Sequence, residues 1–303
     1  MVVGLPFLFS RFAPEIMMTN PPFLPPRAAN SNKGDYGKIV VIGGSRGMSG
    51  APTMASIAAL RSGAGLVRTV VPRSIQSIVA AANLCLMTAG EEEDADGRFA
   101  EAAFDSWMRH AEWADVVVVG PGLGRSDALQ SLTKRFLNAC ERPIVLDADG
   151  LNACGEKPDW LANRKAPTIL TPHPGEFARL TGLPIADVQS RRQELAEQFA
   201  QQFHVLVVLK GNATFVTDGA QTFVNDTGNP GMATGGTGDV LTGVIAAMLG
   251  QGLAPFDAAR LGVHLHGFAG DRAADRIGEV GMIATDLLDE IPLAIRHSPW
   301  RGR

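Results

Sequence analysis

The chain is predicted to be an α/β protein in which a mostly parallel central sheet is covered by helices on both faces. The first observation behind this prediction is the alternation of strand-like and helix-like segments after residue 35. The second is that strand-like segments such as 38–44 and 115–120 are almost wholly apolar, which is typical of strands buried on both faces. The third is that the glycine-rich loops follow such strands, as loops do at the carboxyl edge of a parallel sheet.

The predicted elements follow in order along residues 34–303, which we expect to form a single domain. Strands are predicted at 38–44, 66–71, 115–120, 143–147, 168–171 and 205–209. Helices are predicted at 51–62, 127–139, 187–203, 237–250, 255–275 and 283–296. An Asp-Gly pair at 218–219, between the short runs 214–217 and 221–224, indicates a hairpin. Thr285 is the expected N-cap of the last helix.

Residues 1–33 stand outside this alternation. They contain six prolines and no sustained periodicity, which predicts a Pro-rich N-terminal arm or linker. The apolar stretch 2–9 is too short to span a membrane and lacks the basic leader of a signal peptide. The alternative is that Met17 or Met18 is the true start of the protein.

The composition is that of an ordinary globular protein, with 46% hydrophobic residues and a net charge of −4. Lysine and arginine are scattered rather than clustered, so we expect neither nucleic acid nor a membrane as a partner. Three cysteines, Cys85, Cys140 and Cys154, show no metal-binding spacing. They are expected to be buried, reduced thiols of a cytoplasmic protein, with no zinc site.

The most informative segment is the glycine-rich stretch 225–241, which reads NDTGNPGMATGGTGDVL and runs into an apolar helix. A glycine-rich loop before a helix directs free amide groups at one point, an arrangement that binds phosphate. Asp239 lies in the first turn of this helix. We interpret Asp239 as a base that takes a proton from a hydroxyl undergoing phosphoryl transfer. The alternative is an acid that only complements the helix dipole.

Two more glycine-rich turns, 43–50 and 120–126, follow strands and should share the carboxyl edge of the sheet with the first segment. They indicate a large ligand with several phosphates or ribose groups, unless they are only tight strand–helix connections. Asp147 and Asp149 also follow a strand directly. They are candidates to bind Mg²⁺ through water, although Asp149 has the alternative role of capping a short helix.

A histidine and a lysine follow the next two strands. His173 lies between two prolines that fix its backbone, which favours a ligand contact over a place in the core. Lys210 ends a wholly apolar strand and is interpreted as a phosphate-binding point charge. By contrast, His264 and His266 lie on an apolar helix and are interpreted as packing residues.

Taken together and in order, these segments resemble the ADP- or ATP-dependent NAD(P)H-hydrate dehydratases of the ribokinase-like superfamily. The resemblance covers roughly residues 30–297. Its most specific parts are Thr-Pro-His-Pro-Gly-Glu at 171–176 and Gly-Asn-Pro-Gly-Met-Ala-Thr-Gly-Gly-Thr-Gly-Asp at 228–239. Gly-Thr-Gly-Asp alone is shared with sugar and vitamin kinases. The resemblance implies a ribokinase-like three-layer sandwich and a catalytic domain over 34–303.

The resemblance also implies a lyase that repairs nicotinamide nucleotides. It would phosphorylate the ring hydroxyl of the S-epimer of hydrated NADH or NADPH and then eliminate phosphate, which regenerates NAD(P)H and, from ADP, releases AMP. Asp239 would be the catalytic base. The hydrated dinucleotide would contact Ala51, Gly122, Gly124, His173 and Asp239. The adenine nucleotide would contact Lys210, Gly211, Asn212, Ala213, Thr214 and Gly238. The transferred phosphoryl group would lie on the amides of Gly235, Gly236, Thr237 and Gly238.

Further expectations come from the same resemblance. They are Mg²⁺ as cofactor, with Asp149 or Glu176 as ligands through water, ADP as the donor of a stand-alone enzyme, and a homotetramer. Many relatives carry a fused epimerase domain, for which this chain is too short, so epimerisation is expected from another protein.

Two alternatives stay open at this point. One is a kinase of a hydroxymethylpyrimidine- or hydroxyethylthiazole-like alcohol, against which the 171–176 segment argues. The other is a nucleotide-sensing protein without turnover, against which Asp239 argues.

Overall fold

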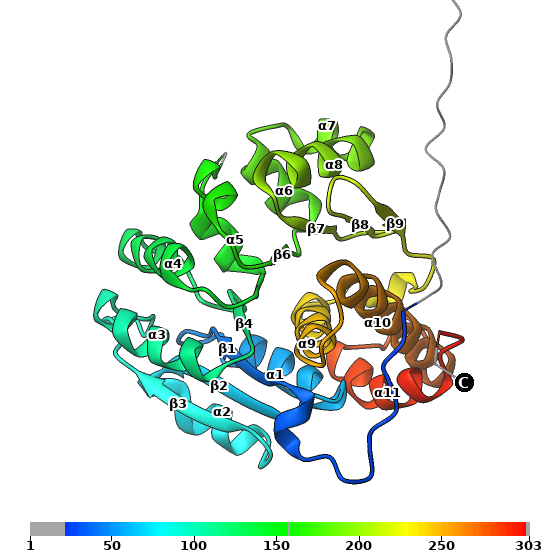
Figure 1. The fold of residues 1–303 in the computed structure, drawn as a ribbon, viewed down its shortest axis with the longest axis horizontal. Helices are drawn as coiled ribbons and strands as arrows, with labels where there is room; N and C mark the ends of the chain where they lie inside the picture. The colour runs from blue at the N-terminus through cyan, green and yellow to red at the C-terminus, as the bar shows by residue number, and fades with distance from the viewer. Residues whose placement is uncertain (1–21, 157, 301–303) are drawn as a thin grey trace, which may run out of the picture.

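The computed structural model describes residues 22–156 and 158–300, which form a sheet flanked by helices (Figure 1). Nine strands of the described chain follow one another across the sheet in the order β3-β2-β1-β4-β5-β6-β7-β8-β9. Neighbouring strands from β3 to β7 run parallel, and β8 and β9 continue the sheet as an antiparallel hairpin. The predicted mostly parallel sheet and the hairpin at 218–219 are therefore confirmed.

The strands are short, and β4, β5, β6 and β7 at the centre of the sheet are buried at every residue. Their bounds are β1 (Lys38–Ile42), β2 (Leu66–Pro72), β3 (Met87–Glu91), β4 (Val116–Val119), β5 (Ile144–Leu146), β6 (Thr168–Leu170), β7 (Leu206–Leu209), β8 (Phe215–Thr217) and β9 (Thr222–Val224). The α-helices are α1 (Gly50–Arg61), α2 (Gln76–Ala82), α3 (Phe104–Trp113), α4 (Asp127–Ala139), α5 (Ala148–Cys154), α6 (Pro174–Thr181), α7 (Ile185–Ser190), α8 (Arg192–Phe203), α9 (Thr237–Gly250), α10 (Pro255–Ile277) and α11 (Ala284–His297).

Side chains of β1 alternate between two apolar cores, one on each face of the sheet. Val40 and Ile42 belong to a core that α3, α4 and α8 cover with large side chains such as Trp107 and Phe136. Ile39 and Val41 belong to the other core, which α1, α9 and α10 cover. Because successive strand residues point to opposite faces, an unbroken apolar strand needs helices on both sides. The three-layer arrangement expected from the sequence is confirmed.

Some elements were missed or misplaced by the sequence analysis. The strand β3 and the helices α2 and α3 were not predicted. For β3 the reason is its sequence, Met-Thr-Ala-Gly-Glu, which has no apolar run and is only half-buried at the sheet edge. The predicted helix 187–203 is two helices, which are interrupted at Arg191, where φ is −130° and ψ is 35°. Thr285 is not an N-cap, because α11 already begins at Ala284. The thiol of Cys85 is exposed, whereas those of Cys140 and Cys154 are buried as expected.

Only residues 22–33 of the expected arm are described, and they lie against the domain. The Arg27 guanidinium donates to the carbonyl oxygen of Gly63 at 2.5 Å and stacks over the Tyr36 ring at 3.9 Å. Leu24 packs against the core beneath α1, α9 and α10. Residues 1–21 lie outside the described residues. In the part of the chain that is described, no helix has both the length and the apolar character needed to cross a membrane.

Candidate active site

The loops that follow the parallel strands are joined side by side at the carboxyl edge of the sheet. The Ser45 hydroxyl after β1 donates to the carbonyl oxygen of Gly122 after β4 at 2.9 Å. The Gly124 amide after β4 donates to Asp149 Oδ2 after β5 at 3.0 Å. The Lys210 amide after β7 donates to the carbonyl oxygen of Pro172 after β6 at 2.9 Å. The structure thus brings together the loops that the sequence analysis assigned to one edge.

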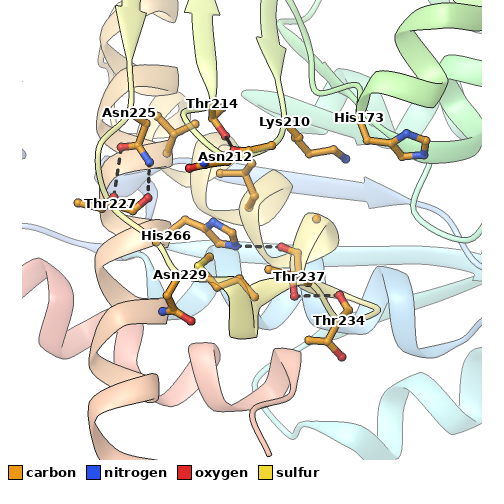
Figure 2. A pocket seen from close by; sticks show the side chains of 18 of the residues that line it. His173, Lys210, Asn212, Thr214, Asn225, Thr227, Asn229, Thr234, Thr237 and His266 are labelled. Atoms are coloured by element: carbon orange, nitrogen blue, oxygen red, sulfur yellow. Dashed lines mark hydrogen bonds between the residues drawn. The ribbon is translucent and has the colours of Figure 1, made fainter. Parts of the chain in front are cut away.

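One half of this edge opens into a cavity of about 710 Å³, a size suited to a nucleotide-sized ligand (Figure 2). Most residues predicted to bind the nucleotide and phosphoryl group line it: Lys210, Gly211, Asn212, Ala213, Thr214, Gly236, Thr237 and Gly238. The predicted base Asp239 lines it too. His173 lines it as well. The predicted residues Ala51, Gly122, Gly124 and Gly235 do not belong to its lining, and neither do the metal candidates Asp149 and Glu176.

The N-terminus of α9 forms the phosphate-type cradle that the glycine pattern predicts. Gly236 precedes the helix with φ 95° and ψ −18°, a left-handed conformation that favours glycine. No side chain caps the helix start, so its first amide groups have neither an intrahelical nor a side-chain partner. A Cβ on Gly238 would lie 3.1 Å from the Lys210 ammonium nitrogen, which shows how closely that charge approaches the cradle. Amides and ammonium together favour an anion at this point.

Lys210 is held by a buried carboxylate. Asp147 is 1% exposed, and its Oδ1 accepts hydrogen bonds from Lys210 Nζ and Thr171 Oγ1, each at 2.8 Å. Its Oδ2 accepts from Thr242 Oγ1 at 2.9 Å. Burial by itself lowers the pKa of Lys210, but the negative charges of Asp147 and Glu176 outweigh it and raise that pKa above its usual value. The lysine therefore stays charged.

Asp239 differs from Asp147 in its electrostatic surroundings. Burial and, after it, the charge of Asp147 raise the pKa of Asp239 to about 7, although Lys210 acts in the opposite direction. A carboxyl group with a pKa near neutrality can both accept and return a proton at physiological pH. Strongly shifted pKa values cluster at functional sites, so Asp239 is a candidate functional residue.

His173 caps the helix α6 with its ring. Its Nδ1 accepts the amide protons of Gly175 and Glu176 at 3.0 and 3.2 Å, while Glu176 Oε2 accepts the His173 amide proton at 2.8 Å. Burial lowers the pKa of His173, which keeps the ring neutral. Because Nδ1 is an acceptor, the proton of the neutral ring lies on Nε2. Nε2 lies 3.4 Å from Glu176 Oε1, and His173 itself lines the cavity.

The carboxylates considered as magnesium ligands are already engaged in hydrogen bonds. Asp149 lies inside the first turn of α5 rather than at its cap, and its Oδ1 accepts from Arg125 Nε and Asn152 Nδ2. Glu176 Oε2 lies 3.9 Å from Lys210 Nζ. Within residues 22–156 and 158–300, no group of three or more His, Cys, Asp or Glu side chains is arranged to hold a metal ion.

His264 and His266 were both predicted to be packing residues, but only His264 has that role alone. His264 stacks on Trp300, with ring centroids 4.0 Å apart and planes within 4°. His266 instead lines the cavity, where its Nε2 lies 2.9 Å from the carbonyl oxygen of Thr237 (Figure 2). Residues that are two positions apart on a helix, as these histidines are, point to different faces. Residue types could not show which face meets the cavity, because α10 is buried on nearly all sides between Ala258 and Ala273.

The three-layer fold, together with an amide cradle beside a paired lysine and an acid of raised pKa, defines an α/β protein of ribokinase-like fold with a candidate nucleotide site. A ribokinase from Arabidopsis thaliana shares this fold, with 14% identity and a TM-score of 0.52 over 86% of this chain and 99% of that chain. More specifically, the chain belongs to the NAD(P)H-hydrate dehydratase family, whose model matches residues 39–293.

Two related proteins and one crystal structure place the chain within the family. A bifunctional NAD(P)H-hydrate repair enzyme from Moorella thermoacetica is 45% identical over 90% of this chain, which spans about half (52%) of that protein. The ADP-dependent (S)-NAD(P)H-hydrate dehydratase of Bacillus subtilis is 36% identical, with 89% of this chain and 92% of that protein covered. A crystal structure of the Bacillus subtilis ADP/ATP-dependent dehydratase, co-crystallised with ATP and Mg²⁺, matches with 32% identity and a TM-score of 0.77. That match covers 90% of this chain and 94% of the other.

Proposed function

We propose that this protein is an ADP-dependent (S)-NAD(P)H-hydrate dehydratase, a hydro-lyase that returns hydrated NADH or NADPH to the reduced dinucleotide. Family membership supports the reaction class, and the Bacillus subtilis relative, matched over nearly its whole length, supports ADP as donor. The observation that carries the proposal is the position of Asp239. It is a carboxyl group with a raised pKa, in the first turn of a helix whose uncapped N-terminus faces the same cavity as Lys210.

In the proposed reaction, Asp239 accepts the proton of the ring hydroxyl while that oxygen forms a bond to the terminal phosphorus of ADP. The bond from phosphorus to the bridging oxygen breaks, and AMP leaves with the electron pair. The phosphate group then leaves the ring carbon with the electrons of the C–O bond, and the neighbouring carbon loses a proton to solvent, which restores the double bond. The amides of Gly235, Gly236, Thr237 and Gly238, together with Lys210, would hold the charge of the transferred group.

The two ligands are proposed to meet at Asp239 from opposite sides. The adenine nucleotide lies along residues 210–214 and Gly238, inside the cavity. The hydrated dinucleotide extends from Asp239 past His173 towards Ala51, Gly122 and Gly124, along the neighbouring turns. A Cβ on Gly122 would lie 2.8 Å from the Met48 carbonyl oxygen and 3.1 Å from the Ala51 Cβ, so the close packing of these two turns requires glycine. Small residues let a ligand approach the backbone closely.

Magnesium is proposed to enter with the nucleotide, where it would neutralise phosphate charge. Mg²⁺ keeps several waters and takes few protein ligands, which fits a site without a ready metal cluster in the described chain. Glu176 is the better candidate for a contact through water. Its Oε2 lies 3.9 Å from Lys210 Nζ, whereas Asp149 contacts Gly124 and Arg125 at the far end of the edge.

Assembly as a homotetramer and a cytoplasmic location stay predictions from the family resemblance. The bifunctional relatives join two repair activities in one chain, and this chain matches about half of each. An enzyme acting on the S-epimer needs the R-epimer to be converted at another active site. We therefore propose that this protein works together with an NAD(P)H-hydrate epimerase.

The decisive experiment incubates the protein with hydrated NADH and Mg²⁺, in the presence of ADP, ATP or no nucleotide. Reduced-nicotinamide absorbance should return only with a nucleotide, and AMP should accumulate when ADP is the donor. A preparation of the Asp239→Asn variant is the matched control. Phosphorylation of a hydroxymethylpyrimidine- or hydroxyethylthiazole-like alcohol, with no recovery of NADH, would replace this proposal with the kinase alternative.

A further inference from the structure

The helix α10 holds the glycine-rich segment at both ends. At the start of the segment, Asp271 accepts the Gly228 amide proton at 2.9 Å and the Asn229 side-chain amide at 3.0 Å. At the other end, His266 reaches the carbonyl oxygen of Thr237, the first residue of α9, at 2.9 Å (Figure 2). The amide cradle lies next to this second contact.

The protonation state of His266 follows from its partner. A backbone carbonyl only accepts, so Nε2 must carry the proton and donate it to Thr237. Burial lowers the pKa of His266 to about 4, and the positive charge of Lys210 acts in the same direction. The ring is therefore neutral at physiological pH, and its single N–H is committed to the first turn of α9.

Such a hold matters because the cradle is flexible by composition. Gly235, Gly236 and Gly238 have no side chains that could fix their backbone, and glycine loses more conformational freedom on ordering than any other residue. A donor that stabilises a transition state is effective only when it is already in place before the reaction. A donor fixed from a neighbouring helix supplies that order without occupying the phosphate site.

We propose that His266 is a positioning residue for phosphoryl transfer, which fixes the amide cradle of α9 through its hydrogen bond to the carbonyl oxygen of Thr237. The inference rests on the proposed function for its kinetic readout but not for its binding readout. It distinguishes His266 from His264, which lies two residues earlier on the same helix and stacks on Trp300 away from the cradle.

The test uses His266→Gln and His266→Leu in the full chain. Glutamine retains an N–H near the position of Nε2, whereas leucine fills similar space without a donor. The matched control is His264→Gln, which disturbs an equally buried histidine of α10 but leaves the cradle contact intact. Thermal melts of all three variants show whether each remains folded.

His266→Leu should lower kcat by about 10–100-fold, because a small misplacement of a catalytic group costs on that order. The KM for hydrated NADH should change little, and glutamine should recover most of kcat. His264→Gln should lower the melting temperature and leave kcat near that of the unmodified protein. A folded leucine variant with unchanged kcat, or equal kinetic losses in the 264 and 266 variants, would overturn the inference.

Calorimetric titration with ADP and with AMP gives a readout that does not depend on dehydratase activity. AMP lacks the phosphoryl group that the cradle would hold. His266→Leu should therefore weaken ADP binding by about tenfold, which is roughly the loss of one charge-assisted hydrogen bond between a cradle amide and the terminal phosphate. It should weaken AMP binding much less. Equal losses for the two nucleotides would overturn the role of His266. Failure of the unmodified protein to repair hydrated NADH while this ADP-specific loss persists would instead overturn the proposed function.

Discussion

The two ends of the carboxyl edge of the sheet are both rich in glycine, but their polar groups differ in whether they have partners within the protein. At the end formed by the loops after β1, β4 and β5, they bond to one another: Ser45 to Gly122, and Gly124 to Asp149. At the end formed by the loop after β7 and the start of α9, the helix amides are uncapped, and Asp239 has a pKa raised to about 7. A glycine shows where the backbone can approach another group closely, whereas binding and reaction of a ligand require polar groups that have no partner within the protein.

The shape of the two ends agrees with this difference. The α9 end encloses the cavity of about 710 Å³. The other end has a smaller hollow of about 240 Å³ between the start of α4 and α5, next to Gly124 and Asp149. We infer that the first end performs the phosphoryl transfer and the second supports the remote part of the hydrated dinucleotide. The following predictions test this division.

The largest effect is expected at Asp239. The Asp239→Asn variant preserves the shape of the side chain but removes the basic oxygen, and loss of a general base lowers rates by roughly 10²–10⁴-fold. Steady-state kinetics with hydrated NADH and ADP measure this loss, with ADP titration as a check that the nucleotide site persists. A variant with near-normal kcat would reduce Asp239 to a partner of the helix dipole.

The next largest effect is expected at Lys210. Lys210→Ala removes the ammonium beside the cradle and leaves the buried Asp147 without its charged partner. We expect weaker ADP binding, little change in binding of the hydrated dinucleotide, and a lower melting temperature, because breaking a buried ion pair is destabilising. Calorimetry of each ligand decides the point, and equal losses for both would contradict the assignment.

Activity should depend on pH through Asp239. Because a base works only when ionised, kcat/KM should fall as pH drops below the pKa of about 7. The stability effect has the opposite sign: a raised carboxyl pKa means that the folded state binds more protons, so stability falls as pH rises from about 4 to about 7. Asp239→Asn should therefore melt at a higher temperature than the unmodified protein at pH 8, and the difference should vanish near pH 4. An unchanged difference across that range would contradict the raised pKa.

A smaller effect is expected at the other end of the edge. Asp149→Asn weakens its bonds to the Gly124 amide and to Arg125, each of which is assisted by the carboxylate charge. The KM for hydrated NADH should rise by about tenfold, in line with the loss of one such bond, while ADP affinity stays the same. If the Mg²⁺ dependence of the reaction changes instead, Asp149 belongs to the metal site and the two ends are not separate.

The smallest effect is expected from the N-terminal segment. A variant that begins at Asn32 loses the contacts of Leu24 and Arg27, which lie against the domain far from the cavity lining. We expect an unchanged kcat and a loss of stability of about 1 kcal/mol, the typical value of one or two such contacts. A folded variant without activity would show that the segment reaches the carboxyl edge of the sheet.

The sequence predicted most of the central sheet because parallel strands are buried on both faces and so must be apolar throughout. It failed at β3 (Met87–Glu91), where an edge position allows a strand with no apolar run. It also joined α7 and α8 into one helix, because both keep the same apolar periodicity and the break at Arg191 is a matter of backbone angles. Burial can be predicted from residue types, whereas the position of a sheet edge or a helix break depends on which elements pack beside it.

The sequence by itself determined the chemistry at the start of α9. Only glycine adopts the conformation at Gly236 without strain, and Asp239 must fall in the first turn of the helix that follows. Tertiary structure decided which distant groups act on that turn. Asp147 meets Lys210 across 63 positions of the chain, and His266 meets Thr237 across 29. Burial next to Asp147 then sets the pKa of Asp239, because desolvation and Coulomb forces depend on distance in space and not on separation along the chain.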